Sequence, residues 1–158
     1  MMIVTGRPVQ LALCVIGIVA LANDVQATNF QQYKNATSCP SVSLCNIDFS
    51  VVPAGKTQEI TNVSCYLRIE DGGALLYAMR LLQISSNGTI NNAVTMQPLP
   101  LDAGNPTGQS ASSVYTSNDT VFTFANATQH FRAFAQLGNS NGGISQFACS
   151  ITGQLVPS

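Results

Sequence analysis

Charged residues are scarce in this sequence, and the shortage excludes several kinds of partner. Asp, Glu, Lys and Arg make up 8% of the chain, whereas a typical soluble domain carries about 25%. The formal net charge is -1, and no basic stripe is present that would neutralise phosphate groups, so we expect no nucleic-acid partner. Ser, Thr, Asn and Gln must provide the polar surface instead, which is common among secreted β proteins.

Residues that usually carry catalysis or bind metals are scarce as well. His130 is the one histidine and no Cys-x-x-Cys pair is present, so we expect neither a zinc site nor another metal or cofactor. A Ser-His-Asp site would have to use His130 with Asp102 or Asp119, and no Gly-x-Ser-x-Gly elbow occurs. Glu70–Gly73 could bind calcium, but a hairpin turn is the favoured interpretation. We therefore expect that the protein is not an enzyme.

A long apolar run of the kind that spans a membrane is also missing. The run from Leu11 to Ala22 is shorter than the roughly 20 residues that a membrane-spanning helix needs. Arg7 precedes it, and Val25 and Ala27 supply small residues at a cleavage site. This order predicts a secretory signal peptide over residues 1–27, a secreted or periplasmic location and no membrane span after cleavage. An uncleaved anchor is the alternative.

The cysteines are the first positive indication of how the exported chain is built. Of the five cysteines, Cys14 lies in the apolar run and four follow it. An even number in an oxidising compartment predicts two disulfides. Three pairings are possible. We favour Cys39–Cys45, which closes a short proline-containing loop, together with Cys65–Cys149, which joins two strands far apart in sequence.

Turn residues divide residues 45–158 into short, mostly alternating apolar runs, which is typical of an all-β domain. Ala74–Ile84 is apolar in both phases and its leucine spacing also fits a helix, but the flanking glycine turns favour a strand. About eight strands are expected, over Asn46–Val52, Thr61–Ile69, Ala74–Ile84, Thr89–Met96, Val114–Thr116, Thr120–Ala125, Gln129–Leu137 and a last one through Phe147–Leu155. The pattern predicts a two-layer antiparallel β-sandwich, or a jelly roll, over residues 45–158, after a polar, irregular arm at 28–44.

Three segments carry a resemblance to a group of known proteins. Phe49–Lys56 reads FSVVPAGK, Ile60–Cys65 reads ITNVSC, and Phe147–Val156 reads FACSITGQLV. Together they resemble short exported β-sandwich proteins of bacteria that carry no assigned activity. The resemblance covers turn and core features of about half the exported chain. It implies the fold and the compartment, and it carries over no catalytic residue.

Aromatic residues supply the candidates for a ligand surface. Tyr66 lies on the outward phase of its strand and Tyr115 borders the long loop Leu101–Ser113; with His130, they are the candidate ligand residues. Phe122 and Phe124 share one face of their strand and are assigned to the core. The absence of Trp weakens a lectin-like interpretation.

Five Asn-x-Ser/Thr sites occur, and the resemblance to bacterial proteins favours reading them as composition rather than as glycosylation sites. They lie at Asn35, Asn62, Asn87, Asn118 and Asn126.

The favoured function is that of an exported, non-enzymatic module acting by surface contact, with a glycan or another exported protein as its partner. A carbohydrate-binding module is the alternative, and a hydrolase centred on His130 is the third hypothesis.

Overall fold

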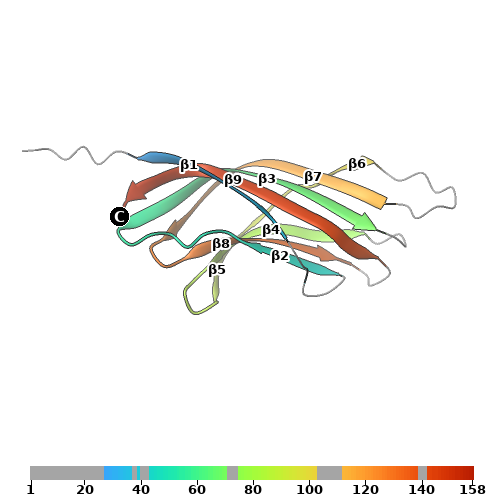
Figure 1. Cartoon of the computed structure of the whole chain (residues 1–158), viewed down its shortest axis with the longest axis horizontal. Helices are drawn as coiled ribbons and strands as arrows, with labels where there is room; N and C mark the ends of the chain where they lie inside the picture. The colour runs from blue at the N-terminus through green and yellow to red at the C-terminus, as the bar shows by residue number, and fades with distance from the viewer. Residues whose placement is uncertain (1–26, 37–38, 40–42, 71–74, 103–111, 139–141) are drawn as a thin grey trace, which may run out of the picture.

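Nine β-strands form two antiparallel sheets in the computed structural model, which describes residues 27–36, 39, 43–70, 75–102, 112–138 and 142–158. The five-stranded sheet has the order β1-β9-β3-β7-β6, and the four-stranded sheet has the order β2-β8-β4-β5. Figure 1 shows the first sheet lying over the second. The strands are β1 Thr28–Asn35, β2 Leu44–Asp48, β3 Lys56–Glu70, β4 Leu76–Ile84, β5 Ile90–Thr95, β6 Leu99–Asp102, β7 Ser112–Asn126, β8 His130–Leu137 and β9 Gly143–Pro157. The predicted two-layer β-sandwich is confirmed.

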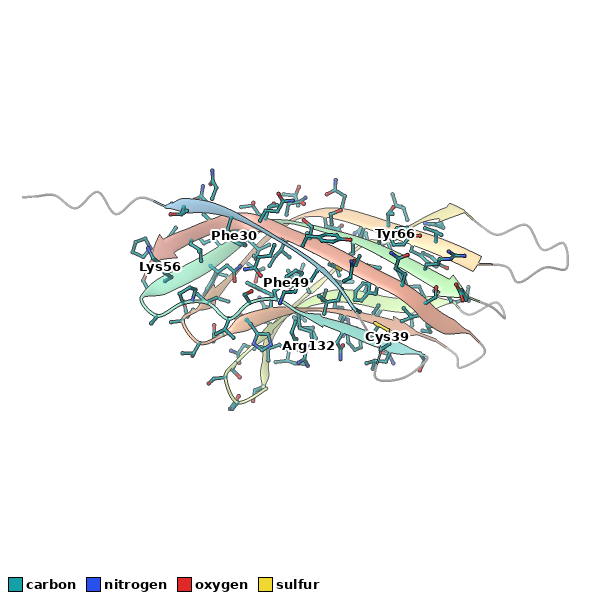
Figure 2. The ribbon with its side chains drawn as sticks, in the orientation of Figure 1. Phe30, Cys39, Phe49, Lys56, Tyr66 and Arg132 are labelled. Carbon is teal, nitrogen blue, oxygen red and sulfur yellow. A yellow bond between two sulfur atoms is a disulfide. The ribbon has the colours of Figure 1, made fainter. Side chains whose placement is uncertain are left out.

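Alternating burial explains why the two sheets pack face to face. In β8 every second residue is buried, namely Phe131, Ala133, Ala135 and Leu137. Successive side chains of a strand point to opposite faces, so an alternating strand presents one apolar face to the partner sheet. Figure 2 shows Phe49 between the two layers, whereas Tyr66 belongs to the upper sheet and Arg132 to the lower one. The interior contains Phe131, Phe147, Ile60, Leu67, Ile69, Met79, Leu81 and Ile151 among its most deeply buried side chains.

Strand β3 lies at the centre of the five-stranded sheet and is bent by a bulge. Its register with both neighbours shifts between Ile60 and Asn62. Gly153 of β9 lies opposite Ile60 at this point, and a Cβ atom added to Gly153 would lie 1.8 Å from the carbonyl oxygen of Glu59. Only glycine permits two backbones to approach so closely. The bulge therefore depends on the glycine at position 153.

Polar contacts link the two layers at one edge of the sandwich. Lys34 of β1 donates a hydrogen bond from Nζ to the carbonyl oxygen of Asp48 at 2.8 Å. The backbone N–H of Ser50 donates to Oε1 of Gln32 at 3.0 Å. Strand β1 thus joins the five-stranded sheet through β9 and also contacts the end of β2. The segment predicted as an irregular arm begins with an ordered strand.

Both favoured disulfides are present. Cys65 and Cys149 are directly opposite each other on β3 and β9, with their Cα atoms 4.1 Å apart, and the bond closes a sequence separation of 84 residues. Cys39 and Cys45 are linked across a separation of 6 residues. The Cys65–Cys149 disulfide joins neighbouring strands of the five-stranded sheet and does not cross between the two sheets.

Strand β7 differs from its prediction in two ways. The Ser-Asn-Asp segment does not turn, because Ser112–Asn126 is one continuous strand paired with β3. Phe122 and Phe124 are not in the core: they are 89% and 56% exposed. Val121, Thr123 and Ala125 fill the inward positions instead. Pairing with β3 decides this phase, because Thr123 lies opposite the buried Ile60, and opposed residues point to the same face.

Several predicted features lie outside the described residues. These are nearly all of the signal peptide, most of the loop Leu101–Ser113 and most of the turn Glu70–Gly73. Within the ranges that the structure describes, there is no helix long and apolar enough to cross a membrane.

Candidate functional site

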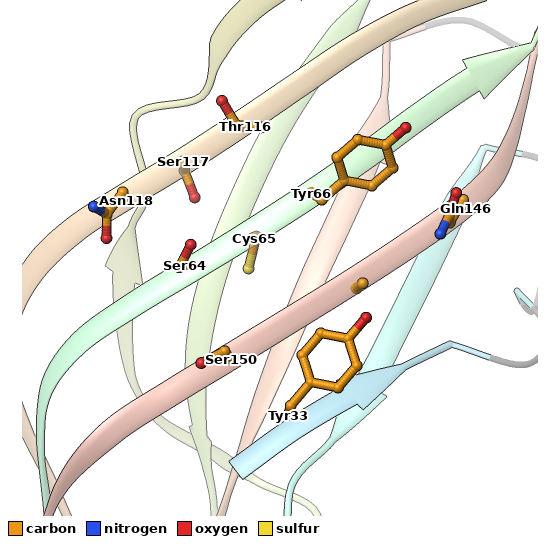
Figure 3. Close-up of a pocket in the computed structure, with 10 residues that line it drawn as sticks. Tyr33, Ser64, Cys65, Tyr66, Thr116, Ser117, Asn118, Gln146 and Ser150 are labelled. Atoms are coloured by element: carbon orange, nitrogen blue, oxygen red, sulfur yellow. The ribbon is translucent and has the colours of Figure 1, made fainter. Parts of the chain in front are cut away.

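A groove of about 470 Å³ lies on the outer face of the five-stranded sheet. Figure 3 shows the tyrosine rings of β1 and β3 on either side of β9, with both hydroxyl groups directed to the same side. Two of the lining residues, Cys65 and Ser117, are buried on the inner face, so the outward side chains define the groove's shape. The lining residues are Tyr33, Ser64, Cys65, Tyr66, Thr116, Ser117, Asn118, Gln146, Ala148 and Ser150.

The register of four neighbouring strands explains why the surface is hollowed here. Tyr33 of β1 lies opposite Ser150 of β9, and Tyr66 of β3 lies opposite Ala148 of β9. Strand β9 therefore places two small side chains between the two tyrosines. Strands in a sheet are about 4.8 Å apart, and the two tyrosines face β9 residues that are two positions apart, about 7 Å along the strand. The tyrosines on β1 and β3 are therefore roughly 12 Å apart across this floor. Small residues flanked by large ones leave the hollow.

Two side chains of the site are held by hydrogen bonds of the protein itself. The Tyr33 hydroxyl donates to Oδ1 of Asn35 at 2.8 Å, which fixes a ring that is 64% exposed. Nδ2 of Asn62 donates to Oδ1 of Asn118 at 3.0 Å and also to the carbonyl oxygen of Asp119 at 3.2 Å. The side-chain oxygen of Asn118 is thus engaged, whereas the side-chain amino group of Asn118 keeps two N–H donors available for a ligand.

The chemistry of the lining restricts the class of ligand that fits. None of the lining residues carries a charge, so a phosphate or a carboxylate would find no cation there. The site combines two aromatic faces with hydroxyl and amide groups. Aromatic faces pack against C–H surfaces, while hydroxyl and amide groups donate and accept hydrogen bonds. The arrangement suits a neutral ligand that has both an apolar face and many hydroxyl groups.

The three ligand residues predicted from sequence do not share one surface. Tyr66 faces outward and lines the groove, as its phase predicted. Tyr115 lies opposite the buried Leu67 and packs against the core. His130 belongs to β8, in the other sheet. Of the three, only Tyr66 lines the groove.

His130 takes part in a separate polar cluster with Asp48 and Arg132. Arg132 donates from Nε and Nη2 to the two carboxylate oxygens of Asp48, with Nη2–Oδ2 at 2.9 Å. Nε2 of His130 lies 3.4 Å from Oδ1 of the same carboxylate. The predicted acids for a His130 site were Asp102 and Asp119. Asp119 instead accepts the backbone N–H of Gln97 at 3.2 Å, and the Asp102 side chain lies outside the described residues.

Electrostatics in this cluster are dominated by Arg132. Its hydrogen bonds hold the pKa of Asp48 below the ordinary value, against the opposing effect of partial burial. The same contact raises the pKa of Arg132. A carboxylate held this way stays ionised and is a poor proton acceptor near neutral pH. The Asp48–Arg132 ion pair links β2 to β8.

Sequence reasoning missed most of the groove. Tyr33 lies in the segment predicted as irregular, and Asn118 lies in the segment predicted as a turn. Ser150 gives no signal by itself, because serines are frequent throughout the chain. The alternation of β3 was the one pattern that located a groove residue, Tyr66.

The sequence matches no protein-family model and no curated protein sequence. Among the described residues, no three His, Cys, Asp or Glu side chains converge as a metal site.

Proposed function

We propose that this protein is an exported, non-catalytic binding module whose outer groove takes a neutral saccharide. One observation carries the proposal: two tyrosines flank a floor of small side chains in a groove with no charged lining residue. Sugar rings offer C–H faces that pack on aromatic rings, and hydroxyl groups that match the Ser, Thr, Asn and Gln of the lining.

Export is supported by the disulfides and by the order of residues at the N-terminus. Disulfides persist in oxidising compartments and are rare in the cytosol. Both bonds lie in the described part of the chain.

A non-catalytic role is supported by the distribution of ionisable groups. No carboxylate or histidine lines the groove in the part of the chain that the structure describes, so none is placed there to act as a general acid or base. His130 faces a carboxylate that Arg132 already engages, and this cluster belongs to the four-stranded sheet.

The test uses the purified, oxidised protein on a glycan array, followed by titration calorimetry with the best saccharide. Tyr66→Ala and Tyr33→Ala should each weaken binding about tenfold or more, because each removes one aromatic wall. Tyr77→Ala is the matched control, since Tyr77 is 70% exposed on the other sheet. It should bind like the unmodified protein.

Two outcomes would contradict the proposal. One is an array on which no saccharide binds. The other is a saccharide whose affinity is the same in Tyr66→Ala as in Tyr77→Ala. Tyr66→Phe separates stacking from hydrogen bonding, because it keeps the ring and removes the hydroxyl group.

A further inference from the structure

The C-terminal part of strand β7 has an outer edge with which no described residue pairs. Strand β6 pairs only with Val114, Tyr115 and Thr116 of β7. On the side away from β3, the stretch Thr120–Ala125 has no ladder partner among the described residues. Its outward N–H and C=O groups are therefore available to another strand.

This edge carries neither lysine nor proline, two of the features by which proteins usually protect such strands, although its register with β3 shifts between Thr120 and Thr123. Thr120–Ala125 reads TVFTFA and contains no charged residue and no proline. Natural edge strands are commonly protected by lysine, proline, bulges or a covering segment. The outer face of the edge instead carries Phe122 and Phe124, which are 89% and 56% exposed.

The order of residues along the edge is symmetric about Thr123. If two copies pair antiparallel about a twofold axis at Thr123, Phe122 of one copy lies opposite Phe124 of the other. Both pairs fall on the outer face, and opposed aromatic residues on one face stabilise an antiparallel pair. The same chain thus supplies both halves of a matched contact, with no charge to repel the second copy.

The area available also fits a pair of copies. Given their exposure, the four phenylalanines could bury on the order of 600 Å² between them, since a fully exposed aromatic side chain buries roughly 200 Å². Backbone pairing over the five residues 121–125 of each copy adds to this. The sum falls in the range of small, reversible interfaces, which bury less than about 1,200 Å².

We propose that the free edge of β7 pairs with the same edge of a second copy, in antiparallel register about Thr123, to form a symmetric dimer. The two five-stranded sheets then join into one continuous sheet. An interface of this kind is isologous and closes after two copies.

Dimerisation would place both grooves on the same face of the joined sheet. Ser117 lies six residues from Thr123, which is about 20 Å along the strand, so the grooves are offset by roughly 40 Å in the strand direction. Two sites on one face can bind a repetitive ligand together and gain avidity. This consequence rests on the proposed function, whereas the dimer itself does not.

The first test is sedimentation velocity over a concentration series of the oxidised protein. We expect reversible dimerisation, and Phe122→Lys should raise the dissociation constant at least tenfold, because a lysine on each copy adds charge to the pairing edge. Tyr77→Lys is the matched control and should dimerise like the unmodified protein. Phe122 is exposed, so the variant should keep its fold, and thermal unfolding checks this.

The second test measures the register. Phe122→Cys and Phe124→Cys proteins of different mass are mixed and oxidised. Opposite residues in an antiparallel pair lie within disulfide range, whereas diagonal ones are about 7–8 Å apart. Cross-linked heterodimers should therefore exceed both homodimers.

Three results would overturn the proposal. They are a monomer at every concentration, a dimer that Phe122→Lys leaves intact, and open-ended assemblies in place of dimers. If Phe122→Lys weakens saccharide binding while the protein stays monomeric, the phenylalanines belong to the ligand surface. A dimer that binds no saccharide would instead refute only the proposed function.

Discussion

The two disulfides should differ in how much they stabilise the fold, because they close loops of very different length. In the chain-entropy model a disulfide stabilises by restricting the unfolded chain, and the effect grows with the logarithm of the loop length. The sequence separations are 84 residues for Cys65–Cys149 and 6 residues for Cys39–Cys45. The difference is (3/2)RT ln(84/6), or about 2.3 kcal/mol.

The perturbation is a pair of double variants, Cys65→Ala/Cys149→Ala and Cys39→Ala/Cys45→Ala. From the same model, the first should lose about 4–5 kcal/mol and the second about 2 kcal/mol. Burial acts in the same direction, because Cys65 and Cys149 are 2% and 1% exposed, whereas Cys39 is only partly buried. Alanine is used because serine would place an unpaired hydroxyl group in the core.

Equilibrium urea unfolding of both variants and of the oxidised protein measures these losses. The slope of the free energy with urea should rise in the long-loop variant, because its unfolded chain is less restricted and exposes more surface. Losses of equal size in the two variants would refute the reasoning. So would an oxidised protein that is no more stable than its reduced form.

Two further predictions concern stability. Gly153→Ala should lower the free energy of unfolding by about 3 kcal/mol, because the new Cβ would meet the Glu59 carbonyl oxygen. Gly55→Ala should lower it by about 1 kcal/mol, because Gly55 lies in open space at φ +69°. Equal losses in the two variants would count against the close approach at Gly153. Asp48→Asn should lower the free energy of unfolding at pH 7 by about 1 kcal/mol or less, because the side chain is half exposed. The pKa of Asp48 is lowered in the folded protein, so the stabilisation by its carboxylate is complete above about pH 4 and is lost as the pH falls through the folded-state pKa. A stability difference between Asp48→Asn and the unmodified protein that stays constant from pH 7 to pH 2 would contradict a stabilising Asp48 carboxylate.

The alternation of strong apolar residues located β8 and the greater part of β3, which begins at Lys56 rather than at the predicted Thr61. In β8, which lies within the predicted strand Gln129–Leu137, the alternating residues Phe131, Ala133, Ala135 and Leu137 face inward. In β3 the same reasoning placed Tyr66 outward. Both strands have one clearly apolar phase, so local sequence and tertiary packing agree.

The same reasoning was wrong for β7, where both phases are apolar. Phe122 and Phe124 form the more hydrophobic phase, yet they face outward. Pairing with β3 sets the phase of β7, and a shift of one residue would turn every side chain of the strand to the other face. The local hydrophobic pattern of β7 carries no information about its register with β3, whose Ile60 is 63 residues from its partner Thr123.

Residues 28–158 by themselves contain the reasons for a disulfide-linked β-sandwich: short alternating runs, frequent turn residues and an even number of cysteines. Which strands become neighbours is a different matter, because it depends on contacts between segments far apart in the chain. Only that arrangement brings Tyr33 and Tyr66 to either side of Ala148 and Ser150, and only it leaves the edge of β7 open. The binding surfaces therefore arise from strand order and register, which cannot be derived from any single segment of the sequence.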